Sequence, residues 1–211
     1  MQLGLLSGTI YNMCNWFARL AYINFLWIFF SLLGLGIFGF FPSTIAMFAT
    51  LRQFLLKNNP PVFKTFWIYY KEEFFRSNKI GLIILLISSL IYINFLLLQS
   101  VNHSLIQMIF FPMLIVTCLF LLTICYFAAG YVHFNQTNLT LFKNSFLIMI
   151  YNPVSNLFII FGFVTIYYLV ILIPGISFFF SGCLVALIIL SSTSLAFAKI
   201  ESKRKITPTY K

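Results

Sequence analysis

The sequence contains very few acidic residues. Aspartate is absent from its 211 residues, and the only glutamates are Glu72, Glu73 and Glu201. Charged residues of both signs make up 8% of the chain, whereas they make up about 25% of an average soluble domain. Proton and ion pathways through membranes use ionisable residues inside the spans. A carboxylate pair of this kind is therefore excluded, except at the adjacent Glu72 and Glu73.

The chain also has little that could bind a metal. Its four cysteines form no C-x-x-C pair and lie in or beside apolar runs, so we expect small buried hydrophobic residues rather than a metal site or a functional disulfide. His133 follows a long apolar run, where a lone histidine is expected to be structural. We predict no catalytic, cofactor-binding or metal-binding residue, and no enzymatic activity. The cysteines are Cys14, Cys118, Cys125 and Cys183.

Apolar residues dominate what remains. They make up 62% of the chain, and phenylalanine alone accounts for 28 residues. A globule of this length exposes too much surface to hide so many apolar side chains. A soluble enzyme, a disordered chain and a secreted disulfide scaffold are therefore excluded. The composition predicts an all-α, polytopic membrane helical bundle that forms one integral membrane domain over residues 1–211.

Two long stretches without charge locate most of the membrane spans. No charged residue occurs in 80–142 or in 144–198. A helical span needs about 20 apolar residues, so each stretch has room for two helices. The polar residues 99–104 divide the first stretch, and Pro174 with Gly175 forms a turn that divides the second. The predicted spans are 80–98, 105–132, 154–173 and 176–198.

The N-terminal region allows two interpretations. A span over 18–35 is apolar and is preceded by Trp16 and Arg19, as at a membrane interface. Gly36, Gly39 and Pro42 predict a structural turn, with Pro42 in the first turn of a second helix. That helix, over about 42–57, either crosses the membrane or lies at its surface. The chain therefore has six spans or, alternatively, five.

The distribution of basic residues favours six spans. With six, both termini share one side and all 13 Lys and Arg residues face it, whereas with five Arg19 alone lies opposite the other 12. Both arrangements place the C-terminus in the cytoplasm. We therefore predict a multi-pass protein of the bacterial plasma membrane with a cytoplasmic C-terminus and, in the six-span arrangement, a cytoplasmic N-terminus. No cleaved signal peptide is expected at the start of the sequence.

The main polar insertion predicts an amphipathic helix over about 61–78. Its aromatic residues recur at spacings of three and four, which places them on one face of a helix. This helix is either an elbow in the headgroup layer that orients the next span or a surface that docks another membrane protein. The candidate docking or interfacial residues are Phe63, Lys64, Phe66, Trp67, Tyr70, Lys71 and Phe74.

The remaining polar residues point to packing rather than chemistry. Amides and hydroxyls within the spans, among them Asn24 and residues 191–194, are expected to form hydrogen bonds between helices. The basic residues are explained by insertion and by anionic lipid, so we expect membrane lipid and no nucleic acid as a partner. The glycine-rich segment 34–39 has no Gly-Lys-Ser/Thr, so an ATPase is expected only through a partner.

Four segments carry a resemblance to a known family. They are 16–19 (WFAR), 24–27 (NFLW), 38–48 (FGFFPSTIAMF) and 63–74 (FKTFWIYYKEEF). These segments resemble the YesL family, bacterial integral membrane proteins of uncharacterised function that are common in Gram-positive bacteria. The resemblance covers about residues 10–95 and brings no catalytic residues with it.

The resemblance implies an accessory role. Members of the family are typically encoded beside ABC importers for oligosaccharides and beside glycoside hydrolases. This context implies an accessory or scaffold subunit for carbohydrate uptake, which binds the permease subunits of an ABC-type importer and has no catalysis or cofactor of its own. The alternative is a small self-contained permease or flippase, which would act as a homo-oligomer.

Overall fold

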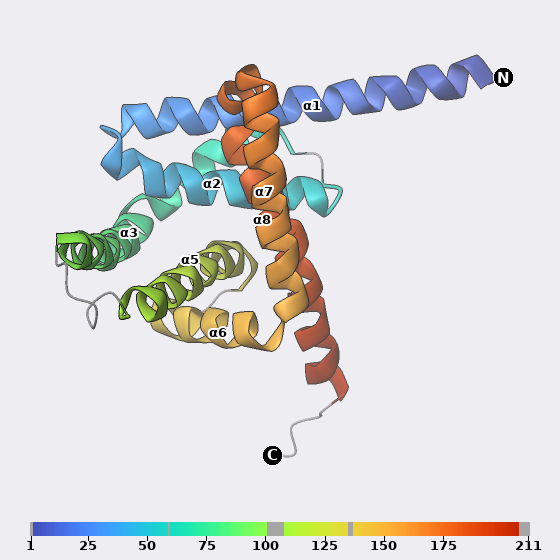
Figure 1. Cartoon of the computed structure of the whole chain (residues 1–211). Helices are drawn as coiled ribbons and strands as arrows, with labels where there is room; N and C mark the ends of the chain where they lie inside the picture. Colours follow the sequence, from blue (N-terminus) through green and yellow to red (C-terminus); the bar gives the residue numbers. More distant parts are fainter. Residues whose placement is uncertain (1, 59, 101–107, 135–136, 207–211) are drawn as a thin grey trace.

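The computed structural model describes residues 2–58, 60–100, 108–134 and 137–206, which form seven helices and no strand (Figure 1). The predicted all-α helical bundle is confirmed. The expected break at 99–104 and the start of the expected span 105–132 lie partly outside the described residues. The helices are α1 Gln2–Leu33, α2 Ile37–Leu55, α3 Val62–Ser100, α5 Phe110–His133, α6 Asn138–Tyr151, α7 Pro153–Leu172 and α8 Pro174–Ile206.

Five of the described helices are long and apolar enough to cross a membrane, namely α1, α3, α5, α7 and α8. This confirms a multi-pass membrane protein. The second N-terminal segment is the helix α2, which is not among these five. By length and composition the count therefore corresponds to the five-span alternative rather than to the preferred six. The physical reason is that Arg52 and Gln53 lower the hydropathy of α2.

Helices α1 and α2 form an antiparallel hairpin (Figure 1). The indole N–H of Trp27 donates to the hydroxyl of Thr44 over 3.1 Å. Further along, the Arg19 guanidinium lies 5.4 Å from the centre of the Phe54 ring. The turn between the helices includes Gly36, whose positive φ of 75° is far more accessible to glycine than to a residue with a Cβ.

Proline and glycine in α2 differ from the expected arrangement. The helix begins at Ile37, so Pro42 lies inside it rather than in its first turn. Proline there removes one backbone donor, and the hydroxyl of Thr44 donates to the carbonyl of Phe40 over 2.7 Å. Gly39 packs against the backbone of α1, where a Cβ would lie 2.5 Å from the carbonyl oxygen of Ser31.

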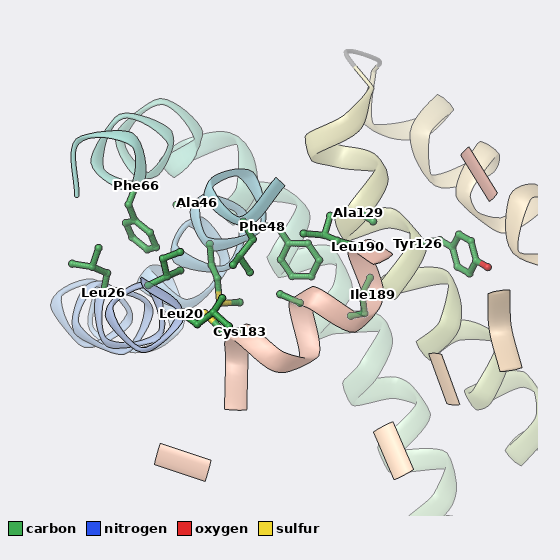
Figure 2. Close-up of a cluster of buried hydrophobic side chains, with 14 of the residues drawn as sticks. Leu20, Leu26, Ala46, Phe48, Phe66, Tyr126, Ala129, Cys183, Ile189 and Leu190 are labelled. Carbon is green, nitrogen blue, oxygen red and sulfur yellow. The ribbon is translucent and has the colours of Figure 1, made fainter. Parts of the chain in front are cut away.

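Helix α2 is the centre of the described structure. A face of small residues at spacings of three and four is fully covered, comprising Gly39, Ser43, Ala46 and Thr50. The buried apolar cluster extends from α1 and the start of α3, across α2, to α5 and α8 (Figure 2). Small side chains let the helices approach closely, which is how membrane helices gain packing energy.

The second half of the chain adds two antiparallel pairs. Helices α7 and α8 pack together and cross the hairpin (Figure 1). Helix α6, which the sequence analysis did not predict, packs on α5 through Leu141, Ser145 and Met149. At 14 residues it is shorter than the roughly 20 that a span needs.

Helix α3 joins two elements that the sequence analysis separated. The amphipathic segment 61–78 and the span 80–98 lie in one continuous helix of 39 residues. No proline interrupts it, and Gly81 is held against the ring of Phe41. The first part of α3 packs against α1 and α2, whereas the part beyond Gly81 is largely exposed.

Several smaller expectations can be compared directly. Pro153 and Pro174 are the first residues of α7 and α8, and Gly175 has open space around it. The cysteine prediction was wrong in part, because Cys183 is buried but Cys14 and Cys118 are exposed and Cys125 is intermediate. In lipid, an exposed cysteine is not penalised as it would be in water, so an apolar neighbourhood in sequence does not imply burial.

Candidate functional site

A cavity of about 330 Å³ opens beside the C-terminal end of α2, between α2, α5 and α8. We call it the basic cavity. Its polar wall has one cationic side chain, Arg52 from the last turn of α2, and His133 from the end of α5. Three hydroxyl residues of α8 complete it, namely Ser191, Thr193 and Ser194.

The lining of the basic cavity contains no carboxylate. Among the described side chains, the one ion pair is between Arg76 and Glu73, at 3.9 Å, and Arg52 takes no part in it. An arginine keeps its charge at any physiological pH and carries only donors. The cavity therefore presents a positive charge to whatever enters it.

The hydroxyl groups that line the cavity already donate their protons within α8. Those of Ser191, Thr193 and Ser194 donate to the carbonyls of Leu187, Ile189 and Ser191 respectively, each over 2.7 Å. A hydroxyl whose proton is used in this way offers its oxygen lone pairs as acceptors. The wall from α8 therefore accepts hydrogen bonds while Arg52 donates them.

Arg52 also borders a smaller cavity of about 110 Å³ on the side of α3, lined by Glu73 and Tyr131. The Tyr131 hydroxyl donates to Glu73, and the Arg76 guanidinium lies 5.1 Å from the centre of the Tyr131 ring. Arg76 also donates to the Asn138 side chain over 3.3 Å. This polar junction ties α3 to α5 and α6 and engages the Glu73 carboxylate.

Asn24 connects α1 to α8 in the buried centre. Its amide donates to the carbonyl of Phe178 over 2.9 Å, and its oxygen accepts from the backbone N–H of Cys183 over 3.2 Å. Asn24 is fully buried. The approach is close, since a Cβ on Gly182 would lie 3.0 Å from the Asn24 oxygen. Here the expected hydrogen bond between helices is present.

The predicted docking residues divide into two groups. Phe66 and Tyr70 are buried, with rings 5.4 and 4.9 Å from that of Phe30 between centroids, and Phe74 is half-buried. Phe63 and Trp67 are exposed, at 51% and 44%, although both also contact Phe30. Lys64 and Lys71 are exposed.

The exposed residues define what we call the outer face of α3. Lys64, Ile68, Lys71 and Phe75 follow one another at spacings of four, three and four residues, and all are exposed. The sequence analysis did not select Ile68 and Phe75, because it followed the aromatic row, in which Phe66 and Tyr70 are buried. Their spacing relative to the two lysines was the signal that could have found them.

The basic cavity was also missed. The only clue in the sequence is that Arg52 occurs in an otherwise apolar segment, and nothing there indicates that 191–194 would lie opposite it. Among the described residues no group of three or more His, Cys, Asp or Glu could hold a metal ion.

These observations define the class of the protein as a small multi-pass helical membrane protein with a buried central helix and a basic cavity. The chain belongs to the family described as "Protein of unknown function, DUF624", whose model matches residues 20–95. The resemblance to the YesL family is confirmed by the relatives that match over most of the chain.

Three relatives come from Bacillus subtilis (strain 168), and all are described as uncharacterized. YteU is 38% identical over 180 residues, which cover 85% of this chain and 81% of YteU. YesL is 29% identical over 92% of both chains, and YesV is 27% identical over 93% of this chain and 95% of YesV. No solved structure matches the chain significantly.

Proposed function

We propose that the protein is an accessory or scaffold subunit of an ABC-type oligosaccharide importer, with no catalysis of its own. Its helices would pack laterally on the permease subunits, and ATP hydrolysis would belong to a partner. The importer is suggested by the genomic context that the family resemblance implies. The observation that supports docking is the outer face of α3.

The outer face of α3 combines basic and large apolar side chains on a segment that the rest of the protein holds rigidly. Phe75 is 79% exposed and Ile68 is 42% exposed. On the opposite side of the same segment, Phe66 is fully buried against α1. A rigid exposed face loses little conformational entropy when it binds, which favours docking.

The α1–α2 hairpin also suggests how the N-terminal half is oriented in the membrane. The hairpin brings Arg19 back beside Phe54, close to Arg52 in sequence. Helix α2 has 19 residues, about 28 Å at 1.5 Å per residue, similar to the hydrocarbon core of about 30 Å. The middle of α2, from Pro42 to Leu51, is largely buried by other helices and so does not need a lipid-compatible surface. Although α2 is not a candidate span by length and composition, we therefore propose that it returns across the membrane as a sixth span and places the basic ends in the cytoplasm.

Affinity purification from native membranes in mild detergent, followed by mass spectrometry, tests the accessory role. Recovery of importer permeases and their ATPase in near-stoichiometric amounts supports it. Replacing Ile68 and Phe75 together by alanine should weaken the interaction about thirtyfold and lower that recovery accordingly, since interface anchors contribute more than about 1 kcal/mol each.

A matched control uses α7. Leu157 and Phe161 are also exposed, at 67% and 72%. They lie on one face of α7 and are four residues apart, against seven for Ile68 and Phe75. Replacing both by alanine should leave the recovered partners unchanged. Equal recovery with the α3 and α7 variants would reject docking through α3, and recovery of the protein without importer subunits would reject the accessory role.

The alternative function is a small permease or flippase that acts alone or as a homo-oligomer. The basic cavity favours it, because a polar cavity between helices is a common feature of a substrate path. Transport of a substrate by the purified protein alone in liposomes would support this alternative. If the protein is purified as a discrete oligomer without importer subunits, the next measurement is transport in liposomes.

A further inference from the structure

Five of the ten residues that line the basic cavity are apolar, and two of these, both leucines, are exposed. Leu190 and Phe197 of α8 line it beside the hydroxyl residues. Leu55 and Leu56 at its edge are 44% and 55% exposed. A soluble anion would gain nothing from these leucines, whereas the acyl chains of a lipid would cover them.

The polar wall specifies the headgroup of such a lipid. Arg52 supplies donors and a fixed positive charge, which match the two free oxygens of a phosphodiester. The hydroxyls of Ser191, Thr193 and Ser194 donate to their own helix and leave acceptors in the cavity. A headgroup that carries hydroxyl donors next to its phosphate would bind both Arg52, through the phosphate, and the α8 hydroxyls, through its own hydroxyls.

We propose that the basic cavity binds an anionic phospholipid whose headgroup carries free hydroxyls, such as phosphatidylglycerol. Arg52 holds the phosphate, the α8 hydroxyls accept from the headgroup, and the acyl chains lie along Leu55 and Leu56. Basic pockets between membrane helices on the cytoplasmic side are known to bind lipid headgroups. A choline headgroup offers no hydroxyl donor and brings a positive charge towards Arg52, so the site should discriminate against it.

This inference does not depend on the importer proposal. The lipid site is a property of the purified chain, and it can be present or absent whether or not a permease binds to α3. The volume of the cavity, about 330 Å³, is roughly ten times the 30 Å³ share of one water molecule in the liquid. It therefore has room for a headgroup.

Native mass spectrometry of the purified full-length protein in mild detergent tests the proposal. Phosphatidylglycerol and phosphatidylcholine are added at equal concentration, and the bound fraction of each is counted. The wild-type protein should retain phosphatidylglycerol preferentially. Arg52→Gln should weaken its apparent affinity by about tenfold or more, as expected for the loss of a charged hydrogen-bonding group.

Two further variants make the result interpretable. Lys143→Gln removes the same charge from an exposed position on α6 and should leave lipid binding unchanged. Ser191→Phe fills the cavity from the exposed side of α8 while Arg52 stays in place, and should lower binding as Arg52→Gln does. This variant also tests the site if Arg52→Gln does not fold, which circular dichroism would reveal.

Three outcomes would overturn the proposal. The first is equal retention of the two lipids by the wild-type protein. The second is binding by folded Arg52→Gln or Ser191→Phe that equals that of Lys143→Gln. The third is complete displacement of the lipid by glycerol phosphate at equal concentration, which would assign the cavity to a soluble phosphate ester instead.

Discussion

Two regions of the protein have similar apolar character and opposite burial. In α8, 39% of the most apolar 18-residue window is buried, whereas in α3 the figure is 6%. We call α1, α2 and α8 the central region and residues 82–100 of α3 the outlying region. Hydropathy does not distinguish α8 from α3, because both helices are apolar enough to cross a membrane.

Side-chain size and hydrogen bonding do distinguish the two regions. The packed face of α8 includes the half-buried Gly182, which lies against Asn24, and the buried Ala186. The outlying region consists mainly of large aliphatic residues and has few small ones. Because lipid tails are as apolar as leucine, hydrophobicity does not drive membrane helices together, and close packing and polar contacts do. The comparison teaches that helix faces made of small or polar residues are the ones that pack against other helices.

The largest expected effect compares a buried and an exposed phenylalanine on α3. Phe66→Ala should lower the free energy of unfolding by up to about 3–5 kcal/mol, because it leaves a cavity against Phe30. Phe75→Ala should change it by less than about 0.5 kcal/mol. Equilibrium unfolding with SDS in mixed micelles measures both. Equal effects would mean that the aromatic row does not anchor α3 to the central region.

The next effect compares two glycines of α8. A Cβ on Gly182 would lie 3.0 Å from atoms of Asn24 and Trp27, whereas nothing lies within 4 Å of the corresponding position on Gly175. Gly182→Leu should therefore destabilise the protein by about 1–3 kcal/mol through overpacking. Gly175→Leu should be nearly neutral. Thermal melting in mild detergent ranks the two, and the opposite order would contradict the close contact between α1 and α8.

The smallest expected change in stability comes from replacing a buried asparagine, and an exposed asparagine serves for comparison. Asn24→Leu removes two hydrogen bonds to the backbone of α8, and contacts of this kind in membranes are worth about 0.6 to 1.7 kcal/mol. Asn94 is exposed, and its amide donates to the carbonyl of Leu90 in its own helix. Asn94→Leu should therefore leave stability unchanged. The same SDS titration measures both variants, and a larger loss for Asn94 would place that residue in an interface.

The helical class, the membrane location and most helix ends could be predicted from the sequence. Charge-free runs and Pro153, Pro174 and Gly175 carry that information directly. The predictions were less successful where packing decides the structure. Helix α6 lacks the length of a span, and the join between the amphipathic segment and the span in α3 has no marker in the sequence.

The candidate site was harder to predict than the fold. Arg52 and 191–194 are far apart in the sequence and meet because α2 and α8 pack together. The aromatic row of α3 was recognised, but which of its residues face inward depends on Phe30. The small-residue face of α2, from Gly39 to Thr50, was readable in the sequence and would have identified the central helix.

The length of α3 has a mechanical consequence. At 39 residues and 1.5 Å per residue it is about 58 Å long, nearly twice the hydrocarbon thickness of about 30 Å. Without a proline or an open glycine, it has no hinge between the part held by Phe30 and the outlying part. A displacement of Lys71 or Phe75 would therefore move the far end as well, with the packing of Gly81 against Phe41 as the pivot.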